Sequence, residues 1–274
     1  MKINKKYIYT NNRQLFRLLI SESNKLIVED RDIEKKQAYF NCLDAASGRD
    51  IFRNLQLEEK FWIGIEAVYK DVIYFHKYAK PDMPGHKEII AFDISQQKIL
   101  WHSDSVLFLF MHDDRMYGFR QKFETREFYA LDYLSGELVE ELGNDPEGIN
   151  LIRDSIDEEA QYRDYLFPNT YFPDKIHDIE IKVIIDKFTV GLNIEGNVEF
   201  VRYGNVLLFN YYERLSDRTL VNRFLAADLH TQELIYDEVL NSGANSFVPD
   251  SFFMKHNLVF ILKEKKEIIV SEIV

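Results

Sequence analysis

The sequence of 274 residues contains a single cysteine, Cys42, so no disulfide can form within the chain. Because Cys42 lies inside an apolar segment, we expect it to be a small buried hydrophobic residue rather than a nucleophile. Glycine is scarce, with 11 residues, and no glycine-rich loop of the phosphate-cradling kind is present. A Gly-x-Ser-x-Gly motif is also missing, so the sequence carries no signature of a nucleophilic serine.

No apolar run reaches the length of a membrane-spanning helix, and Arg17 interrupts the apolar stretch Leu15–Ile20 near the N-terminus. We therefore expect no export signal and a cytoplasmic protein. Positive charge is also in deficit, because 34 Lys and Arg stand against 46 Asp and Glu, a net charge of −12. Binding to phosphates or anionic lipids needs clustered basic residues, so we expect neither nucleic acid nor a membrane as partner.

The chain does contain a recurring sequence motif: an apolar run, an aspartate, a short polar spacer with Ser, Thr or Gly, and another apolar run. The anchoring aspartates are Asp44, Asp93, Asp132 and Asp228. A carboxylate at this position can accept hydrogen bonds from the turn amides that follow it, so these aspartates are predicted turn caps rather than catalytic groups. Short strands repeated every 40 to 50 residues or so are typical of β-propeller blades.

Each repeat reads as four short strands, and the high aromatic content of 14% suits such strands. The last repeat stops where its fourth strand should begin, after Lys266–Ile273. The segment Lys5–Thr10 is surplus before the first repeat and can supply that strand, which removes an exposed sheet edge. We therefore predict an all-β fold, a single β-propeller domain over residues 1–274 with five four-stranded blades closed by the N-terminal strand.

Residues 143–197 break the period and are expected to form a partly helical insertion or a degenerate blade. Asp145 followed by Pro146 is typical of a helix start, and isoleucines at 149, 152 and 156 follow at helical spacing. An aromatic-rich loop then covers residues 162–172. The alternating segment Ile179–Ile194 is interpreted as a hairpin or a degenerate extra blade, so the count of blades is five or six.

The repeat resembles that of quinoprotein-like propellers of the pyrroloquinoline-quinone type, in which Asp, a Thr/Ser-Gly turn and a Trp eight residues after the Asp recur. Eight residues after the four aspartates stand Phe52, Trp101, Glu140 and Tyr236, so one repeat keeps the Trp. The resemblance implies a quinoprotein-like propeller fold. Because the full motif matches once, it gives no warrant for a bound quinone, and we expect no cofactor.

In such a fold the long loop Lys77–Lys87 and the insertion would share one face, and long loops on a rigid scaffold are where binding sites collect. We predict that this face binds a protein partner or a small ligand. The predicted site consists of Tyr78, His86, Tyr162, Tyr165, Phe167, Tyr171, Phe172 and His177. The competing interpretation is that these aromatic residues only pack the insertion against the ring.

The sequence was also searched for metal-ligand sets and for acid/base pairs. His102 and the run His112-Asp113-Asp114 match no defined metal-site spacing, so we expect no metal site and interpret Asp113-Asp114 as a polar turn. Adjacent carboxylates in strands point to opposite faces, which argues against an acid/base pair. The sequence thus predicts a non-catalytic binding or scaffold protein. The alternative is a propeller enzyme acting on a sugar or related metabolite, with His86 and His177 as acid/base residues.

Overall fold

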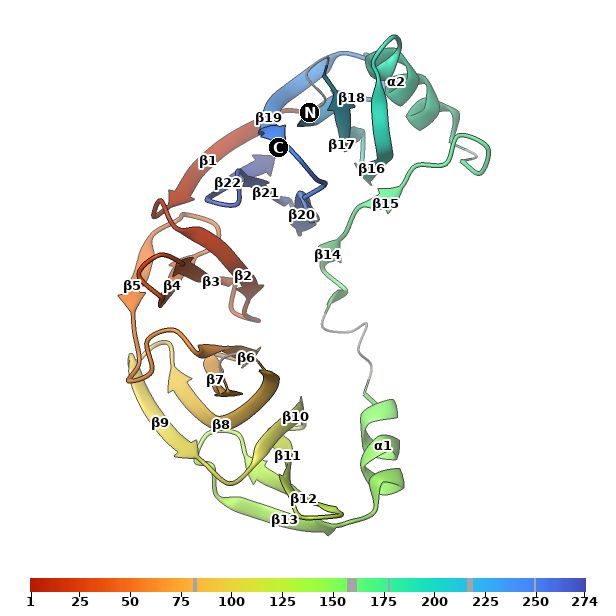
Figure 1. Cartoon of the computed structure of the whole chain (residues 1–274). Helices are drawn as coiled ribbons and strands as arrows, with labels where there is room; N and C mark the ends of the chain where they lie inside the picture. The colour runs from red at the N-terminus through yellow and green to blue at the C-terminus, as the bar shows by residue number, and fades with distance from the viewer. Residues whose placement is uncertain (81–82, 157–161, 177, 216–218, 249) are drawn as a thin grey trace. The chain divides into compact units, whose positions relative to one another are not determined.

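The computed structural model describes residues 1–80, 83–156, 162–176, 178–215, 219–248 and 250–274. These residues form five antiparallel sheets and two short helices (Figure 1), which confirms the all-β class. The chain divides into two compact units. Residues 13–161 form one, called here the three-sheet unit; residues 1–12 and 162–274 form the other, the two-sheet unit.

The three-sheet unit consists of three four-stranded sheets, each built from strands consecutive in sequence. The first sheet contains β2 (Gln14–Ile20), β3 (Lys25–Asp32), β4 (Gln37–Asp44) and β5 (Asp50–Leu55). The second contains β6 (Ile63–Tyr69), β7 (Val72–Lys80), β8 (Met83–Asp93) and β9 (Lys98–Ser103). The third contains β10 (Leu107–His112), β11 (Arg115–Gln121), β12 (Arg126–Asp132) and β13 (Leu138–Gly143), followed by helix α1 (Pro146–Asp154). The four-strand repeat predicted from the sequence is present in all three sheets.

The two-sheet unit contains two five-stranded sheets, each of which gains a two-residue strand from the segment after residue 162. One sheet has the order β15-β16-β17-β18-β19, with β15 (Asn169–Thr170), β16 (Ile194–Tyr203), β17 (Val206–Arg214), β18 (Leu220–Asp228) and β19 (Leu234–Ala244). The other has the order β1-β22-β21-β20-β14, with β1 (Ile3–Thr10), β22 (Glu267–Ile273), β21 (Leu258–Lys263), β20 (Phe252–Lys255) and β14 (Tyr165–Leu166). Helix α2 (Ile179–Thr189) belongs to this unit.

The N-terminal strand completes the last sheet, as the sequence predicts. Strand β1 pairs antiparallel with β22, and its register places Ile8 opposite Ile269 and Tyr7 opposite Val270. The two chain ends are joined further by hydrogen bonds between Lys2 and Val274 in both directions. Strand β1 therefore satisfies backbone groups along β22 that would otherwise form an open sheet edge.

The recurring aspartates cap the turns β4–β5, β8–β9, β12–β13 and β18–β19. The Oδ1 atom of Asp44 accepts from the amide of Ser47 at 2.8 Å, and that of Asp132 accepts from the amide of Ser135 at 2.7 Å. Asp93 and Asp228 accept equivalent bonds from Gln96 and Thr231. Four residues after each aspartate the backbone has positive φ, at Gly48, Gln97, Gly136 and Gln232. The predicted capping role is confirmed for all four aspartates.

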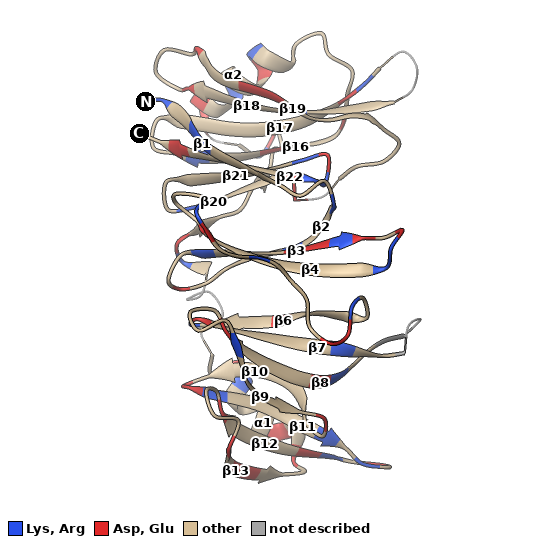
Figure 2. Ribbon diagram, turned by 90° about the vertical axis from the view of Figure 1, so that its left-hand side faces the viewer, with Lys and Arg blue, Asp and Glu red and all other residues tan. Residues whose placement is uncertain are grey.

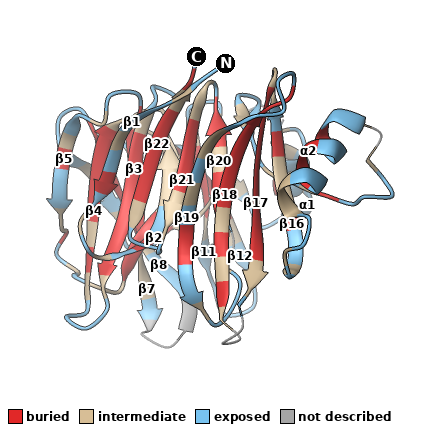
Figure 3. Cartoon of the chain, turned by 90° about the horizontal axis from the view of Figure 1, so that it is seen from above, coloured by how far each residue is buried: buried red, intermediate tan, exposed pale blue. Residues whose placement is uncertain are grey.

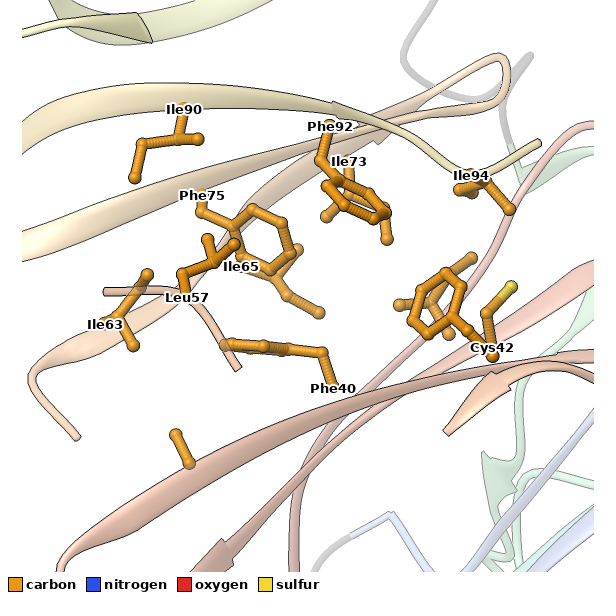
Figure 4. Close-up of a cluster of buried hydrophobic side chains, with 13 residues drawn as sticks. Phe40, Cys42, Leu57, Ile63, Ile65, Ile73, Phe75, Ile90, Phe92 and Ile94 are labelled. Carbon is orange, nitrogen blue, oxygen red and sulfur yellow. The ribbon is translucent and has the colours of Figure 1, made fainter. Parts of the chain in front are cut away.

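The core of the three-sheet unit is built from alternate residues of neighbouring sheets. Figure 4 shows the cluster that joins the first two sheets, in which the rings of Phe40 and Phe75 lie 4.5 Å apart. Cys42 belongs to this cluster and is fully buried, and burial raises the pKa of its thiol to about 12. The expectation that Cys42 is a small buried residue is confirmed. Figure 3 shows how burial differs between strands: β3, β4, β17 and β18 are largely buried, whereas β5 is more exposed.

Helix α1 begins as predicted, because Asp145 is its N-cap and accepts from the amide of Glu147 at 2.9 Å. The interpretation of Ile179–Ile194 as a hairpin or degenerate blade is wrong, since residues 179–189 form helix α2. Asp178 caps this helix, and the buried residues Ile181, Ile184 and Ile185 follow helical spacing. The alternation at Ile179, Ile181 and Val183 was misleading, because Ile179 and Val183 are exposed.

Two smaller expectations have different outcomes. The loop predicted over Lys77–Lys87 is largely a hairpin, because β7 continues to Lys80 and β8 begins at Met83; the cross-strand ion pair Lys77–Glu88, at 2.7 Å, supports this extension. Asp113 and Asp114 form the predicted turn, between β10 and β11, with φ of 45° and 61°.

Figure 2 shows Lys and Arg interspersed with Asp and Glu along the strands and turns. Neither α1 nor α2 has the length and apolar composition needed to cross a membrane.

Candidate functional site

The predicted site residues fall into two groups. Tyr78 and His86 belong to the three-sheet unit, where they lie on paired strands. The aromatic residues between 162 and 172 belong to the two-sheet unit. His177 lies outside the described residues. Because the two groups belong to different units, each is described by itself.

The first group sits near the turn of the β7–β8 hairpin, at the end where β7 stops and β8 begins. Tyr78 is directly opposite His86, and His76 is two residues before Tyr78 on the same face of β7. On the neighbouring strand β6, Gly64 is opposite His76, and a register shift between Ile65 and Ala67 makes Glu66 an extra, bulged residue. The hairpin and the bulge together bring a glutamate and two histidines to one point, the His-Glu cluster of Glu66, His76 and His86.

One carboxylate oxygen is shared by both imidazoles. The Oε2 atom of Glu66 lies 2.7 Å from Nδ1 of His86 and 3.0 Å from Nδ1 of His76. The two imidazole rings are stacked, with centroids 3.5 Å apart and planes 8° from parallel. His76 is buried, whereas the side chain of His86 is 40% exposed. The cluster therefore has a buried inner imidazole and an accessible outer one.

The ring of His76 is close to Glu66 but makes no hydrogen bond of good geometry through either nitrogen. A buried polar atom without a partner costs about 1–3 kcal/mol, so such atoms are uncommon in native proteins. Gly64 makes room for this ring, since a Cβ at that position would lie 3.2 Å from Cε1 and 3.3 Å from Nε2 of His76. The ring thus occupies a space that any other residue at position 64 would narrow.

Charged side chains of the first sheet hold the edge strand β6 in place. Glu29 accepts from the amide of Ile65 at 3.2 Å, and Arg31 donates to the carbonyl of Ile63 at 2.7 Å. Arg17 donates to the carbonyl of Ile65. Arg31 and Glu29 are both buried and form an ion pair, with Nε of Arg31 2.8 Å from the carboxylate. These bonds satisfy backbone groups on either side of Gly64 and fix the strand that carries Glu66.

Aromatic rings form one wall of the His-Glu cluster. Tyr78 lies edge-on to both imidazoles, with centroids 5.0 Å from His76 and 5.5 Å from His86, and Trp62 packs edge-on against Tyr78. Burial raises the pKa of Glu66, but the neighbouring His76 and His86 lower it by more, so its pKa lies below the ordinary value. Glu66 is therefore a carboxylate at neutral pH.

An anionic carboxylate beside two imidazoles can orient a histidine for proton transfer or supply three ligands to a metal ion. Sequence reasoning found His86 but missed Glu66 and His76. The available signal was the position of the two histidines: His76 comes directly before the loop predicted over Lys77–Lys87, and His86 lies at the end of that loop. Glu66 reaches the two histidines because of a β-bulge in β6 and because β6 pairs with β7. Neither feature could be predicted from the spacing of residues in the sequence.

In the second group, Tyr162, Tyr165 and Phe167 form an aromatic cluster together with Phe253. Tyr165 and Phe167 stack with centroids 5.6 Å apart and planes 7° from parallel, and the ring of Tyr162 lies edge-on to both. Phe253 packs beneath Tyr165 and Phe167 at 6.2 Å from each, and stacks in turn on Phe260. Tyr162 and Phe167 remain 50% and 52% exposed. The cluster is thus anchored on one side and open to solvent on the other.

Strand β14 carries the centre of this aromatic cluster. Tyr165 is paired with Lys255 in β20, and the ammonium of Lys255 lies 4.9 Å from the centroid of the Tyr165 ring. Burial raises the pKa of Tyr165 to about 12, so its hydroxyl stays neutral. A cation–π contact and a backbone ladder thus fix the ring on which Tyr162 and Phe167 rest.

The remaining two predicted residues lie apart from these ring contacts. Tyr171 is buried against α2 and donates from its hydroxyl to Asp186 at 3.3 Å, so it packs the helix onto its sheet. Burial raises the pKa of Tyr171 to about 12. Phe172 is 48% exposed, and its ring is covered on one side by the ammonium of Lys175, 5.0 Å from the ring centroid. Tyr171 therefore packs helix α2 against its sheet, as the competing interpretation of the aromatic residues expected.

Comparison with known proteins gives three findings. The family model described as "Domain of unknown function (DUF4905)" matches residues 20–101, a range that includes Glu66, His76 and His86. No curated protein matches the chain. Among solved structures, the chain is similar to one titled "Crystal structure of the eukaryotic initiation factor", with 7% identity and a TM-score of 0.32 over 95% of this chain and 52% of that chain. The chain thus spans about half the length of that solved chain.

Proposed function

We propose that the chain is a non-catalytic β-propeller protein of the cytoplasm that binds a protein partner through the aromatic cluster. The propeller part of the proposal is supported by the sheets, which are built from consecutive antiparallel strands, and by the pairing of β1 with β22. In a propeller each sheet is a blade, and a shared last blade of this kind closes the ring. The binding part is supported by a different observation.

The observation that carries the binding function is the exposure of Tyr162 and Phe167 on a rigid aromatic base. Their rings are about half exposed; both pack against Tyr165, and Phe167 also packs against Phe253. Aromatic side chains are enriched at the centres of protein interfaces, and a few of them typically supply most of the binding free energy. Leu166, also exposed, adds an aliphatic side chain to the same segment. This composition suits an apolar segment of a protein partner.

The test replaces both exposed rings in the variant Tyr162→Ser/Phe167→Ser of the full chain. Proteins captured from a lysate by the immobilised wild type are quantified against this variant, and the affinity of each purified candidate is then measured. Truncation of an interface hot spot costs about 2 kcal/mol, so we expect the dissociation constant to rise at least about 30-fold.

The matched control is Phe123→Ser, because Phe123 is 99% exposed but belongs to the three-sheet unit. The proposal requires this control to bind like the wild type. A partner with equal affinity for the wild type and the double variant would contradict it, as would a loss that occurs equally in Phe123→Ser. If the partner is a second copy of this chain, sedimentation shows wild-type dimers that the double variant does not form.

A further inference from the structure

We propose that Glu66, His76 and His86 form a binding site for one divalent transition-metal ion of the class that includes Zn²⁺ and Co²⁺. The site lies in the three-sheet unit and uses no residue of the aromatic cluster. It is thus independent of the proposed partner binding, and either proposal can fail without the other.

The kinds of ligand favour this class of metal. Imidazole nitrogen suits Zn²⁺, Co²⁺, Ni²⁺ and Cu²⁺, whereas Mg²⁺ and Ca²⁺ prefer sites made of oxygen ligands. The cluster offers two imidazole nitrogens and one carboxylate oxygen. Three protein ligands leave at least one coordination position for water or another small molecule.

The separations between ligand atoms are close to those that a metal needs. Zinc ligands lie about 2.0–2.2 Å from the metal, so two ligands of a tetrahedral site are about 3.3 Å apart. The Glu66 oxygen lies 2.7 Å and 3.0 Å from the two Nδ1 atoms, and all three ligand atoms lie within 4.8 Å of one another. The two oxygen–nitrogen separations therefore need to widen by only a few tenths of an ångström.

Binding also requires one ring to turn. The lone pair of an imidazole nitrogen lies in the ring plane, so two parallel rings 3.5 Å apart cannot both direct lone pairs at one ion. His76 is fixed by burial beneath Gly64, whereas the side chain of His86 is 40% exposed and close to the end of the hairpin. We therefore assign the movement to His86, whose ring leaves the stack and turns its Nδ1 toward the ion.

The buried ring of His76 supplies an independent reason for a ligand at this point. Its Nδ1 faces the carboxylate without making a hydrogen bond of good geometry, although the ring is almost fully buried. A metal bound by Nδ1 would give this nitrogen a direct partner, while Nε2 would keep its present surroundings. The bonds from Glu29, Arg31 and Arg17 to β6 fix the backbone next to Glu66 before any ion arrives, which lowers the cost of ordering the site.

The test uses the full chain without an affinity tag, treated with a chelator and then dialysed. Calorimetric titration with zinc chloride is expected to give one ion per chain. Titration with Co²⁺ gives a visible absorption spectrum that reports imidazole coordination. The variants Glu66→Gln and His86→Ala each remove one ligand while leaving the buried ring in place. Loss of groups that merely orient ligands weakens metal binding about 10–100-fold, so we expect losses at least that large.

The matched control is His112→Ala. Nε2 of His112 lies 3.2 Å from a carboxylate oxygen of Asp113, an imidazole–carboxylate pair without a second histidine. The His112→Ala variant should bind Zn²⁺ like the wild type. His76→Ala is assayed with circular dichroism as a check on folding, and Glu66→Gln carries the test if that variant unfolds. The proposal is overturned if the wild type binds no ion, if Glu66→Gln and His86→Ala both keep wild-type affinity, or if the loss follows His112→Ala.

Discussion

The indole of Trp101 lies directly over Gly136. A Cβ atom at position 136 would come within 2.5 Å of Cδ2 of Trp101, and Gly136 has φ of +71°. The indole Nε1 donates to the carbonyl of Tyr133 at 3.2 Å, in the same turn. Trp101 of the second sheet is thus fitted to the Asp132–Gly136 turn of the third sheet, both within the three-sheet unit.

Gly136→Ala should therefore lower the free energy of unfolding by about 2–4 kcal/mol, because it combines a positive φ with a steric clash. Gly143→Ala is the matched control, since Gly143 has φ of +73° and no atom within 4 Å of its Cβ position. Urea unfolding of both variants measures the difference. Equal losses in the two variants would show that contact with Trp101 contributes nothing.

The buried ion pair of Glu29 and Arg31 should be costly to break. Arg31→Met leaves the carboxylate of Glu29 buried without its cation and removes donors to the carbonyls of Phe61 and Ile63. We expect a loss of about 3–5 kcal/mol in the free energy of unfolding. Arg115→Met breaks an exposed pair with Glu140 and should cost less than about 1 kcal/mol. Similar losses in both variants, measured by thermal unfolding, would contradict this expectation.

The turn aspartates should make stability depend on acid pH. Hydrogen bonding from the Ser135 amide holds the pKa of Asp132 below its ordinary 3.8, and bonding from Ser47 does the same for Asp44. A carboxyl whose folded-state pKa is lowered stabilises the fold above its unfolded pKa, and this stabilisation is lost as the pH falls through the folded-state pKa.

The free energy of unfolding of Asp132→Asn should therefore be below that of the wild type at neutral pH and should converge with it as the pH falls below 3.8. Denaturation midpoints at a series of pH values measure this. Glu124→Gln, which changes an exposed carboxylate in the β11–β12 turn, serves as the control. A difference in the free energy of unfolding between the wild type and Asp132→Asn that stays constant with pH would refute the capping interpretation.

Strand β1 should be essential to the two-sheet unit. Tyr9 is fully buried, whereas its neighbour Ile8 is 47% exposed. Tyr9→Ala should lower the free energy of unfolding by about 3–5 kcal/mol, the usual cost of truncating a buried aromatic residue, and Ile8→Ala by much less. Deletion of residues 1–10 exposes the edge of β22 and should cause aggregation. Unchanged melting and monomeric elution of the deletion variant would show that β1 is dispensable.

The parts of the fold that the sequence determined are those with local causes. Asp44 and Asp132 could be assigned to turns because a carboxylate bonds to amides two and three residues ahead, whatever the rest of the chain does. The start of α1 followed from Asp145 and Pro146 for the same reason. One long-range feature was predictable as well: the pairing of Lys5–Thr10 with the last strand, because a repeat with a missing strand leaves a sheet edge that needs a partner.

Only the tertiary structure decided which face of a segment is buried and which distant residues meet. Ile179–Thr189 carried both an alternating and a helical pattern, and packing against β17 and β18 selected the helix through Ile184 and Ile185. Glu66, His76 and His86 converge because of strand register and one bulge. Local sequence specifies turns through hydrogen bonds within a few residues, whereas register is set by the summed packing of strands far apart in the chain.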